Sequence, residues 1–389
     1  MIRLLLSACL AGLLIASEAD AQGKSVQPYE IDVVLPLTGG GAFGGQTHQK
    51  GLEILQSIYN RQGGINGQPI HFVFYDDQTN PQIAVQLTSG LINKRRQAVI
   101  GSDLSAMCRA MAPLFANGPV QYCLSPAIHP AKDSFTFSAN IDSKDLTAAN
   151  LHFVRDRGWN RVAMLSTTDA SGQDNDAAYA ANFKLPENKA LTLVDKEQFN
   201  PTDLNVSAQL ARIAGAHPQV LIVAVPGAPF ATVLRGMTAI GLDVPVISTS
   251  ANMVTAQLKD YKSFMPKQLY FAGVGYAVGM ARNKASEEAQ RVFANALKEA
   301  GLPMDVQIGL PWDPAGIIID ALRHVGTSAT PQRVRDYIET LHDYAGITGI
   351  YDFRDGSQRG LTVQDVVMVR WNPETSGWSA ASKFGGGTK

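Results

Sequence analysis

The chain has no excess of charge of either sign, and this absence excludes whole classes of partner. Its 389 residues include 33 Lys and Arg against 34 Asp and Glu, so the formal net charge is -1. A protein that binds nucleic acid or an anionic membrane through its charge carries a basic excess. We therefore expect no nucleic-acid partner and no attachment to a membrane through charge.

The chain also lacks the motifs of common hydrolases and metalloenzymes. It has no G-x-S-x-G elbow, no H-E-x-x-H pair and no Cys/His cluster at metal-ligand spacing. The adjacent acids Asp76 and Asp77 follow a predicted strand, where neighbouring side chains point to opposite faces. We interpret this pair as structural loop and helix-capping carboxylates, and we expect a protein that is not an enzyme and uses neither metal nor cofactor.

Long hydrophobic runs are missing, but a short one lies at the N-terminus. In "MIRLLLSACLAGLLIASEADAQ", the apolar stretch 4–16 follows Arg3 and is too short for a membrane span of about 20 residues. With the small residues at 19–21, it has the layout of a secretory signal, so we expect a signal peptide at 1–21, cleaved after Ala21. An alternative lipoprotein box ending at Cys9 would leave almost no apolar segment before the cleavage site.

Cysteine is scarce, and removal of the signal peptide leaves Cys108 and Cys123. In an oxidising compartment such a pair can be bridged, whereas the alternative is two buried thiols that pack as small hydrophobic groups. The first lies near the start of a predicted helix and the second at the end of the next strand, and those ends share one side of a parallel sheet. Both interpretations stay open here, because the sequence does not give the Cα separation that a disulfide needs.

What is present is a regular alternation of apolar runs and helical patterns. Near-continuous apolar runs such as "VLIVAV" are typical of parallel strands covered on both faces. We expect strands at 30–36, 70–75, 98–100, 120–124, 161–166, 220–224, 244–248 and 268–272, and a last strand at "VVMVRW" followed by a polar tail. We expect helices at 46–61, 81–94, 146–157, 205–216, 228–240, 284–300 and 315–325. Two successive series of alternating strands and helices predict two doubly wound α/β lobes.

A glycine-rich loop, "LTGGGAFGG", follows the first predicted strand. Gly39, Gly41 and Gly44 match the dinucleotide fingerprint G-x-G-x-x-G. Three residues separate the strand from Gly39, however, and the next strand ends at Asp76, much further along than the about 20 residues that a ribose-binding acid requires. We interpret the segment as a loop that brings backbone close to a ligand and leads into a helix beginning near Gln46.

Several stretches together resemble a known family. "LPLTGGGAFGGQTHQKGLEIL", "GGINGQPI", "YDDQTNP", "VIGSDLSAM" and "LSPAIHP" are similar, in this order, to the type I periplasmic solute-binding proteins of ABC importers, in the leucine/isoleucine/valine-binding branch. The resemblance implies two α/β lobes joined by three hinge crossings, near 140–145, 273–279 and 349–353. Lobe one then comprises 28–142 and 280–350, and lobe two comprises 143–279 and 351–385. It also implies a periplasmic monomer that closes around a small ligand and delivers it to membrane permease subunits.

The resemblance places four candidate ligand-binding residues on lobe one. Ser105 and Ala106 follow one strand at the start of a helix, where a hydroxyl and free backbone amides can hold a carboxylate. An ordinary helix cap is the alternative role for Ser105. Ala127 and His129 follow the neighbouring strand. The family's amino-acid binders have Thr where this chain has His129, and a lone loop histidine is otherwise solvated or packed.

Lobe two departs from the amino-acid binders. The position of the acid that pairs with the ligand's ammonium falls near Ser250, and the aromatic walls fall near Ser171 and Pro226. A buried ammonium without a counter-charge costs several kcal/mol. Asp169 is a possible substitute acid, although a single loop acid is more often a turn or capping residue.

These departures predict a ligand with a carboxylate and no α-amino group, in a cavity enlarged by the loss of two aromatic walls. We favour an aromatic acid such as a benzoate or cinnamate derivative, with Phe43 and Trp312 as candidate stacking partners, although Trp312 also suits plain core packing. A branched-chain or other amino acid is the alternative ligand. A ligand-sensing regulatory module of the same fold is the alternative function, and the predicted signal peptide favours a carrier.

Overall fold

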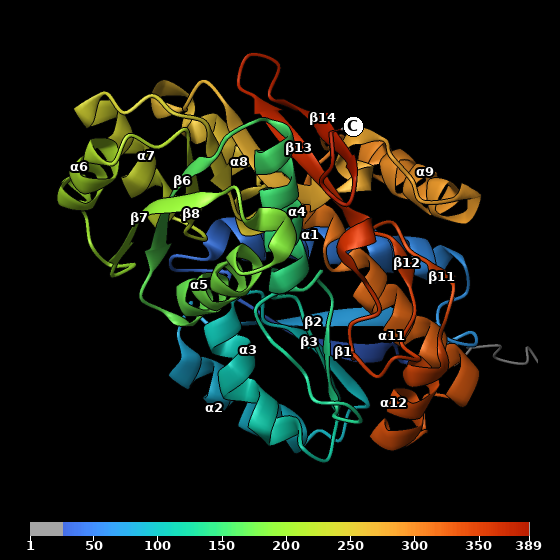
Figure 1. Cartoon of the computed structure of the whole chain (residues 1–389). Coiled ribbons are helices and arrows are strands. Elements are labelled where there is room, and N and C mark those ends of the chain that lie inside the picture. Colours follow the sequence, from blue (N-terminus) through green and yellow to red (C-terminus); the bar gives the residue numbers. More distant parts are fainter. Residues whose placement is uncertain (1–25, 389) are drawn as a thin grey trace, which may run out of the picture.

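The computed structural model describes residues 26–388, and these form two α/β bodies, each built around its own sheet (Figure 1). We call the body around the five-stranded sheet the first lobe and the body around the seven-stranded sheet the second lobe. The predicted signal peptide and Cys9 lie outside the described residues.

The first lobe contains a parallel sheet with strand order β2-β1-β3-β4-β5. Its strands are β1 (Tyr29–Leu35), β2 (Ile70–Asp76), β3 (Ala98–Gly101), β4 (Val120–Cys123) and β5 (Thr136–Ser138). The associated helices are α1 (Ala42–Arg61), α2 (Pro81–Ile92), α3 (Ser105–Met111), α10 (Val306–Gly309), α11 (Trp312–Val325) and α12 (Pro331–Thr340). Consecutive strand residues pack on opposite faces: Val33 belongs to the main core and Val34 to the cluster under α2 and α3. Burial of both faces explains the continuous apolar runs of these strands.

The second lobe contains a mixed sheet with order β14-β13-β10-β9-β8-β6-β7, parallel from β7 to β10 and antiparallel at β13 and β14. Its strands are β6 (Arg161–Thr167), β7 (Thr192–Phe199), β8 (Val220–Ala224), β9 (Val246–Ser248), β10 (Leu269–Val274), β13 (Val366–Asn372) and β14 (Gly377–Phe384). Its helices are α4 (Ser143–Asp156), α5 (Ala170–Phe183), α6 (Ser207–Gly215), α7 (Pro229–Ile240) and α8 (Thr255–Asp260). Helix α4 packs against β10, β13 and α5.

Smaller elements complete the described chain. Helix α9 (Lys284–Glu299) contacts β11 (Tyr344–Ala345), which forms a short antiparallel pair with β12 (Ile350–Tyr351). Short 3-10 turns occur at η1 (Ala112–Phe115), η2 (Pro186–Asn188), η3 (Ser250–Asn252), η4 (Lys262–Phe264), η5 (Gly275–Val278) and η6 (Val363–Asp365).

The predicted fold class is confirmed: two lobes with parallel-sheet cores account for the structure. The chain passes between the sheets after β5, after β10 and before β13. The lobe boundaries and hinge positions stay predictions. The segment after β12 remains bonded to the first lobe as far as Gln358, whose carbonyl accepts from the Ser138 amide at 2.9 Å. We therefore propose that the third boundary lies after Gln358 rather than at 349–353.

The sequence-based element assignment is wrong in several places. Helices α5 and α12 and strands β5 and β7 were not expected, and the predicted polar tail contains strand β14, which pairs with β13. Helix α1 begins at Ala42 rather than near Gln46, because the glycine segment itself forms the first turn. The strands β7 and β14 lie at the two edges of their sheet, where polar residues are tolerated on the exposed side.

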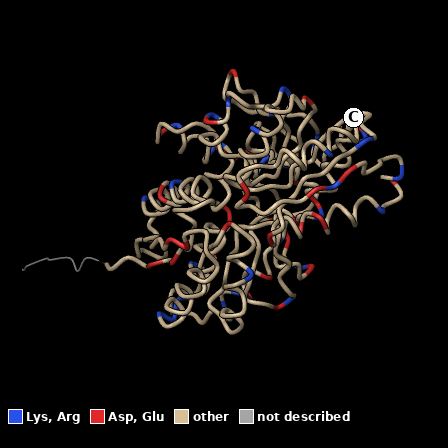
Figure 2. The backbone as a smooth tube through the Cα atoms, turned by 90° about the vertical axis from the view of Figure 1, so that its left-hand side faces the viewer, with Lys and Arg blue, Asp and Glu red and all other residues tan. Residues whose placement is uncertain are grey.

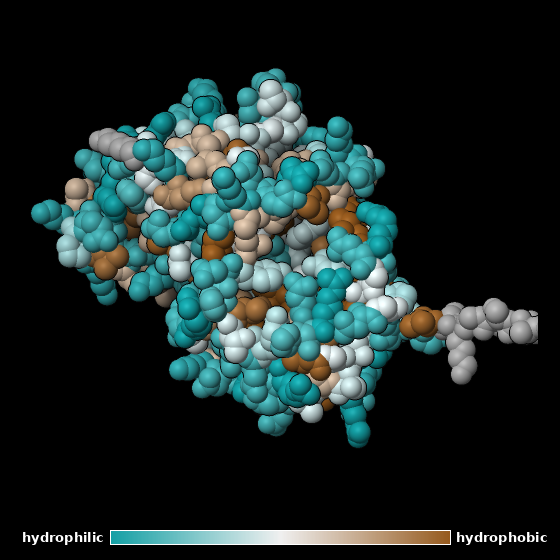
Figure 3. All heavy atoms as spheres, turned by 90° about the vertical axis from the view of Figure 1, so that its right-hand side faces the viewer, coloured by the Kyte–Doolittle hydropathy of each residue, from teal (hydrophilic) through white to brown (hydrophobic). Residues whose placement is uncertain are grey.

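The surface carries both charge signs and no large apolar area on the faces shown. Figure 2 shows Lys and Arg interspersed with Asp and Glu over both lobes. The face in Figure 3 is mostly hydrophilic, with hydrophobic areas that are small and separated. Among residues 26–388, no helix combines the length and the hydropathy that crossing a bilayer requires.

Candidate functional site

A cavity of about 620 Å³, a volume that includes its open mouth, lies between the two lobes. The first lobe lines it with residues that follow β3 and β4, and the second lobe with α4, α5 and the carboxyl ends of β8 and β9. Ligands of open α/β sheets bind at these carboxyl ends, which makes this cavity the candidate site. Its lining residues are Asp103, Leu104, Ser125, Pro126, Ala127, Ser143, Leu146, Thr147, Asn150, Ser171, Asn175, Tyr179, Ile222, Val223, Ala224, Pro226, Ile247, Ser248, Thr249, Ser250, Ala251 and Ala272.

A smaller cavity of about 450 Å³ adjoins it and shares Asp103 and Leu104 with it. The glycine segment lines this space, together with Phe43 of α1 and Gly227 of the second lobe. The Ala228 amide donates to the Gly40 carbonyl at 3.3 Å, so the glycine segment contacts the second lobe directly.

Hydrogen bonds to Asp76, one of the two acids interpreted above as structural, hold the start of the glycine segment. Asp76 Oδ1 accepts from the amides of Leu37 and Thr38 at 2.9 and 3.1 Å, which lowers the pKa of Asp76 even though its partial burial acts in the opposite direction. A Cβ at Gly45 would lie 2.2 Å from the Pro36 carbonyl oxygen, so a side chain cannot be accommodated there. Close packing of the first turn of α1 against the residue that follows β1 thus requires glycine at position 45.

Two serines meet across the lobes beside the main cavity. Ser105 is the first residue of α3, is fully buried, and has its Oγ 2.6 Å from the Oγ of Ser171 in the first turn of α5. No side chain caps α3, since the N-cap residue is Leu104. Two hydroxyls therefore meet at one edge of the cavity, which Ser171 lines and Ser105 adjoins, an arrangement able to donate hydrogen bonds to an anion.

An acid that the sequence analysis did not assign also lines the cavity. Asp103 Oδ2 lies 3.5 Å from Nε2 of buried His48, and Asp103 Oδ1 has no hydrogen-bond partner within the described structure. His48 Nδ1 lies 2.7 Å from the Gln307 carbonyl oxygen and must donate to it. The expectation that the cavity offers nothing to a positive group is therefore wrong on the first-lobe side, although within residues 26–388 no acid from the second lobe lines it.

Three other lining residues carry buried polar atoms without partners inside the described part of the chain. These atoms are Ser143 Oγ, Asn150 Oδ1 and Thr249 Oγ1. A buried polar atom without a partner costs free energy, so such atoms on residues that line a cavity indicate where a bound molecule makes hydrogen bonds.

His129 does not line the main cavity and instead joins the lobes through acids. Its Nε2 lies 2.7 Å from Asp174 of α5, and its Nδ1 lies 3.2 Å from Asp142 at the first interlobe passage. Hydrogen bonds to Asp142 and Asp174 raise the pKa of His129 to about 9. Arg109 shares Asp174 at 3.2 Å, and Arg359 lies 3.2 Å from Asp142. These five side chains, which we call the interlobe ion cluster, make His129 a contact between lobes in this structure.

The remaining candidates divide between the cavity and other places. Ala127, Pro226 and Ser250 line the main cavity, as does Ser171. Ala106 packs beside the cluster under α2 and α3. The Asp169 side chain caps α5 by accepting from the Gly172 amide at 3.0 Å. Asp169 therefore has the capping role that the sequence analysis gave as the alternative to a ligand-binding acid.

The two candidate aromatic partners are also separated. Phe43 lines the smaller adjoining cavity. Trp312 packs edge-on against Phe293 with ring centroids 4.8 Å apart and borders a different hollow of the first lobe. The plain packing interpretation of Trp312 therefore fits its position, and Trp312 does not reach the main cavity.

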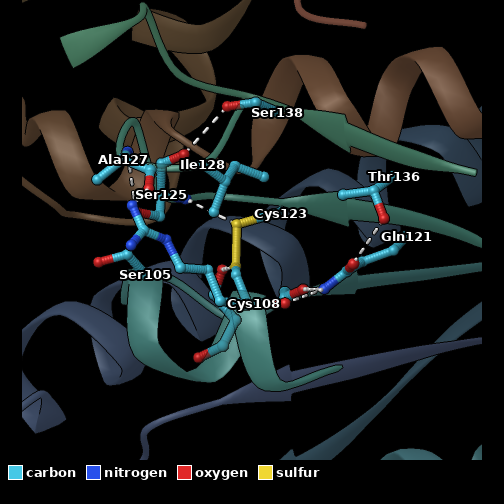
Figure 4. Close-up of a disulfide and its surroundings, with 12 residues drawn as sticks. Ser105, Cys108, Gln121, Cys123, Ser125, Ala127, Ile128, Thr136 and Ser138 are labelled. Atoms are coloured by element: carbon cyan, nitrogen blue, oxygen red, sulfur yellow. Dashed lines mark hydrogen bonds between the residues drawn. A yellow bond between two sulfur atoms is a disulfide. The ribbon is translucent and has the colours of Figure 1, made fainter. Parts of the chain in front are cut away.

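Cys108 and Cys123 form a disulfide with Cα atoms 6.0 Å apart, so the bridged alternative is confirmed. Figure 4 shows the bridge between α3 and β4, close to Ser105 on one side and Ser125 and Ala127 on the other. The bridge thus ties together two of the segments that line the cavity. Within residues 26–388 no group of His, Cys, Asp and Glu side chains could hold a metal ion.

Comparisons with known proteins agree with this architecture. A family model described as periplasmic binding protein matches residues 28–377. A Leu/Ile/Val-binding protein homolog of Brucella melitensis is 22% identical over 197 residues, which are 49% of this chain and 52% of that relative. The chain thus spans about half the length of this curated relative.

Two solved structures show the same fold. The substrate-binding protein of a branched-chain amino acid transporter from Streptococcus pneumoniae, in complex with isoleucine, matches with a TM-score of 0.75, 16% identity and coverage of 91% of this chain and 99% of that one. A solute-binding protein of an ABC transporter from R. palustris, in complex with benzoate, matches with a TM-score of 0.74, 18% identity and coverage of 91% and 95%. The predicted resemblance to the leucine/isoleucine/valine-binding branch is confirmed. Because the family model covers most of its length, this chain belongs to the periplasmic binding protein family.

Proposed function

We propose that this protein is the solute-capturing component of an ABC importer and that it binds a small organic carboxylate between its two lobes. The favoured ligand is an aromatic acid such as a benzoate or cinnamate derivative. The observation that carries this proposal is the 2.6 Å approach of the Ser105 and Ser171 hydroxyls at the edge of a largely apolar cavity. A carboxylate placed there accepts from both hydroxyls and from the uncapped first turn of α3.

The lining residues support an apolar ligand body. Leu104, Leu146, Ile222, Val223 and Ile247 are the large aliphatic side chains of the lining. The lining also includes three small side chains, those of Ala224, Ala251 and Ala272. Most known ligand pockets combine such an apolar body with a few placed polar groups.

Asp103 supports a second candidate, a branched-chain or other amino acid. Its unpartnered Oδ1 is an acceptor for an ammonium group two residues from Ser105, which serves the carboxylate in both candidates. The Asp103 carboxylate nevertheless already faces a side chain of this protein, because its Oδ2 lies 3.5 Å from Nε2 of His48. This pairing favours the ligand without an ammonium group.

The proposal includes the protein's place in the cell. We infer a monomer that is exported, with the signal peptide removed, and that delivers its ligand to permease subunits when the lobes close. Closure driven by ligand contacts is a population shift between an open and a closed arrangement.

Native mass spectrometry of protein purified without refolding tests the ligand class. We expect an added mass that denaturation releases as a nitrogen-free organic acid. Release of an amino acid would overturn the favoured ligand and support the second candidate.

A further inference from the structure

The main cavity extends inward along two helices of the second lobe. Ser143, Thr147 and Asn150 follow one face of α4 at helical spacing, and a separation of seven residues spans about 10 Å along a helix. Ser171 and Tyr179 line the cavity from α5 and lie about 12 Å apart along its axis. The cavity therefore has an outer end at Ser171, beside Ser105, and an inner end between α4 and α5.

The side-chain amide of Asn150 lies at the inner end of the cavity. Asn150 is 5% exposed, and its Nδ2 donates to the Tyr179 hydroxyl at 2.7 Å. Tyr179 is itself 3% exposed, so this bond is shielded from water. The other end of the amide, Asn150 Oδ1, is buried and has no partner among the described residues.

An unpartnered buried acceptor of this kind indicates a donor on the ligand. A hydrogen bond to Asn150 Oδ1 removes the cost of leaving this oxygen unpaired. Within the described lining, Asp103 is the only charged side chain, and it lies with Leu104 at the first-lobe end rather than on α4 or α5. A cationic donor at the inner end would have no counter-charge there, so a neutral hydroxyl fits this position better.

We propose that Asn150 is the specificity residue of the site and binds a neutral hydroxyl at the end of the ligand opposite its carboxylate. The inference rests on the proposed function and narrows its ligand class to hydroxylated organic acids. Tyr179 is a positioning residue, because it acts on the ligand only through the Asn150 amide.

Titration calorimetry with two ligand pairs tests this assignment. The pairs are benzoate with 4-hydroxybenzoate, and cinnamate with 4-hydroxycinnamate. We expect the wild-type protein to bind the hydroxylated member of at least one pair about tenfold more tightly or better, because its partner leaves Oδ1 unpaired. In Asn150→Leu, which keeps a similar side-chain volume, that preference disappears.

Two further variants test whether the hydroxyl preference depends on the Asn150 amide and its orientation. Tyr179→Phe frees the amide to rotate and is expected to reduce the preference in a protein whose melting temperature shows that it is folded. Asn93→Leu is the matched control, since this exposed amide donates to the Ser89 carbonyl at 3.3 Å and lies outside the main cavity, and it should leave the hydroxyl preference unchanged.

The outcomes distinguish a failure of the Asn150 assignment from a failure of the proposed function. Equal binding within both pairs, or a hydroxyl preference that survives in Asn150→Leu and Tyr179→Phe, overturns the role of Asn150 and leaves carboxylate capture standing. If none of the four acids binds, the proposed function is overturned, and this inference falls with it.

Discussion

The hydroxyl oxygens of Ser105 and Ser171 lie 2.6 Å apart, although these residues belong to helices of different lobes. Each helix begins just after the carboxyl end of a strand, so the contact joins the ligand-binding edges of the two sheets. A ligand carboxylate at this point contacts both lobes at once. We propose that this geometry couples ligand binding to the relative position of the lobes.

Replacement of Ser105 tests the carboxylate contact. Ser105→Ala removes one charge-assisted hydrogen bond of about 1.5–3 kcal/mol, so we expect a Kd for the aromatic acid about tenfold to a hundredfold weaker by titration calorimetry. Ser134→Ala is the matched control, because its hydroxyl donates to the Thr136 carbonyl and lies outside the main cavity. An unchanged Kd in Ser105→Ala would remove this residue from the site.

Replacement of Asp103 distinguishes the two ligand classes. Asp103→Asn removes a negative charge from the cavity and keeps its shape. The interaction between the Asp103 charge and a charged group of the ligand is on the order of 1 kcal/mol, so its loss changes the Kd about fivefold. We expect tighter binding of a ligand that has only a carboxylate and weaker binding of an amino acid. Calorimetry of the variant with benzoate and with leucine measures both directions. Weaker benzoate binding would contradict the favoured assignment.

The interlobe ion cluster predicts a dependence on pH. Bonds to Asp142 and Asp174 raise the pKa of His129 to about 9 when the lobes are in contact, whereas the free side chain titrates near 6.5. The contact is thus fully present below about pH 6.5 and is lost as the pH rises through about 9. The other charged side chains of the cluster are the guanidinium groups of Arg109, beside Asp174, and Arg359, beside Asp142.

The expected result is a ligand affinity that falls between pH 7 and pH 10 in the wild-type protein and falls less in His129→Gln. Calorimetry across this range measures it, with small-angle scattering at each pH as a check of compaction. Identical pH profiles for the two proteins would show that His129 does not act as a contact between lobes.

The disulfide predicts a contribution to stability. Cys108 and Cys123 are 15 residues apart, and closing a loop of this length stabilises a fold by about 3 kcal/mol in the chain-entropy model. We expect the double variant Cys108→Ser with Cys123→Ser to lower the free energy of unfolding by about 2–3 kcal/mol in urea denaturation. Its Kd for the ligand should also weaken, because the bridge holds Ser105 relative to Ala127. A stability equal to that of wild type would contradict this account.

The sequence predicted the buried strands well because their signal is local. Continuous apolar runs identify β1, β3, β6 and β8, which lie inside their sheets. The edge strand β7 carries charged residues and reads as a loop, and α5 has many small and polar residues and so shows little helical periodicity.

The site was only partly predictable for a related reason. The family resemblance pointed to Ser105, Ala127, Ser171, Pro226 and Ser250, which follow strands or begin helices; the last four line the main cavity, and Ser105 lies beside it. The Asn150 contact depends on Tyr179, which is 29 residues away in a helix that was not expected. Asp103 stood within the quoted stretch "VIGSDLSAM", but its approach to His48, at 3.5 Å, and its place in the cavity depend on tertiary packing.

Titration calorimetry of the intact mature protein with leucine and with benzoate-type acids tests the central claim most directly. The account predicts binding of an aromatic acid, with the lobes brought together in solution, and weak or no binding of leucine. Tight binding of leucine together with no binding of any aromatic acid would contradict it.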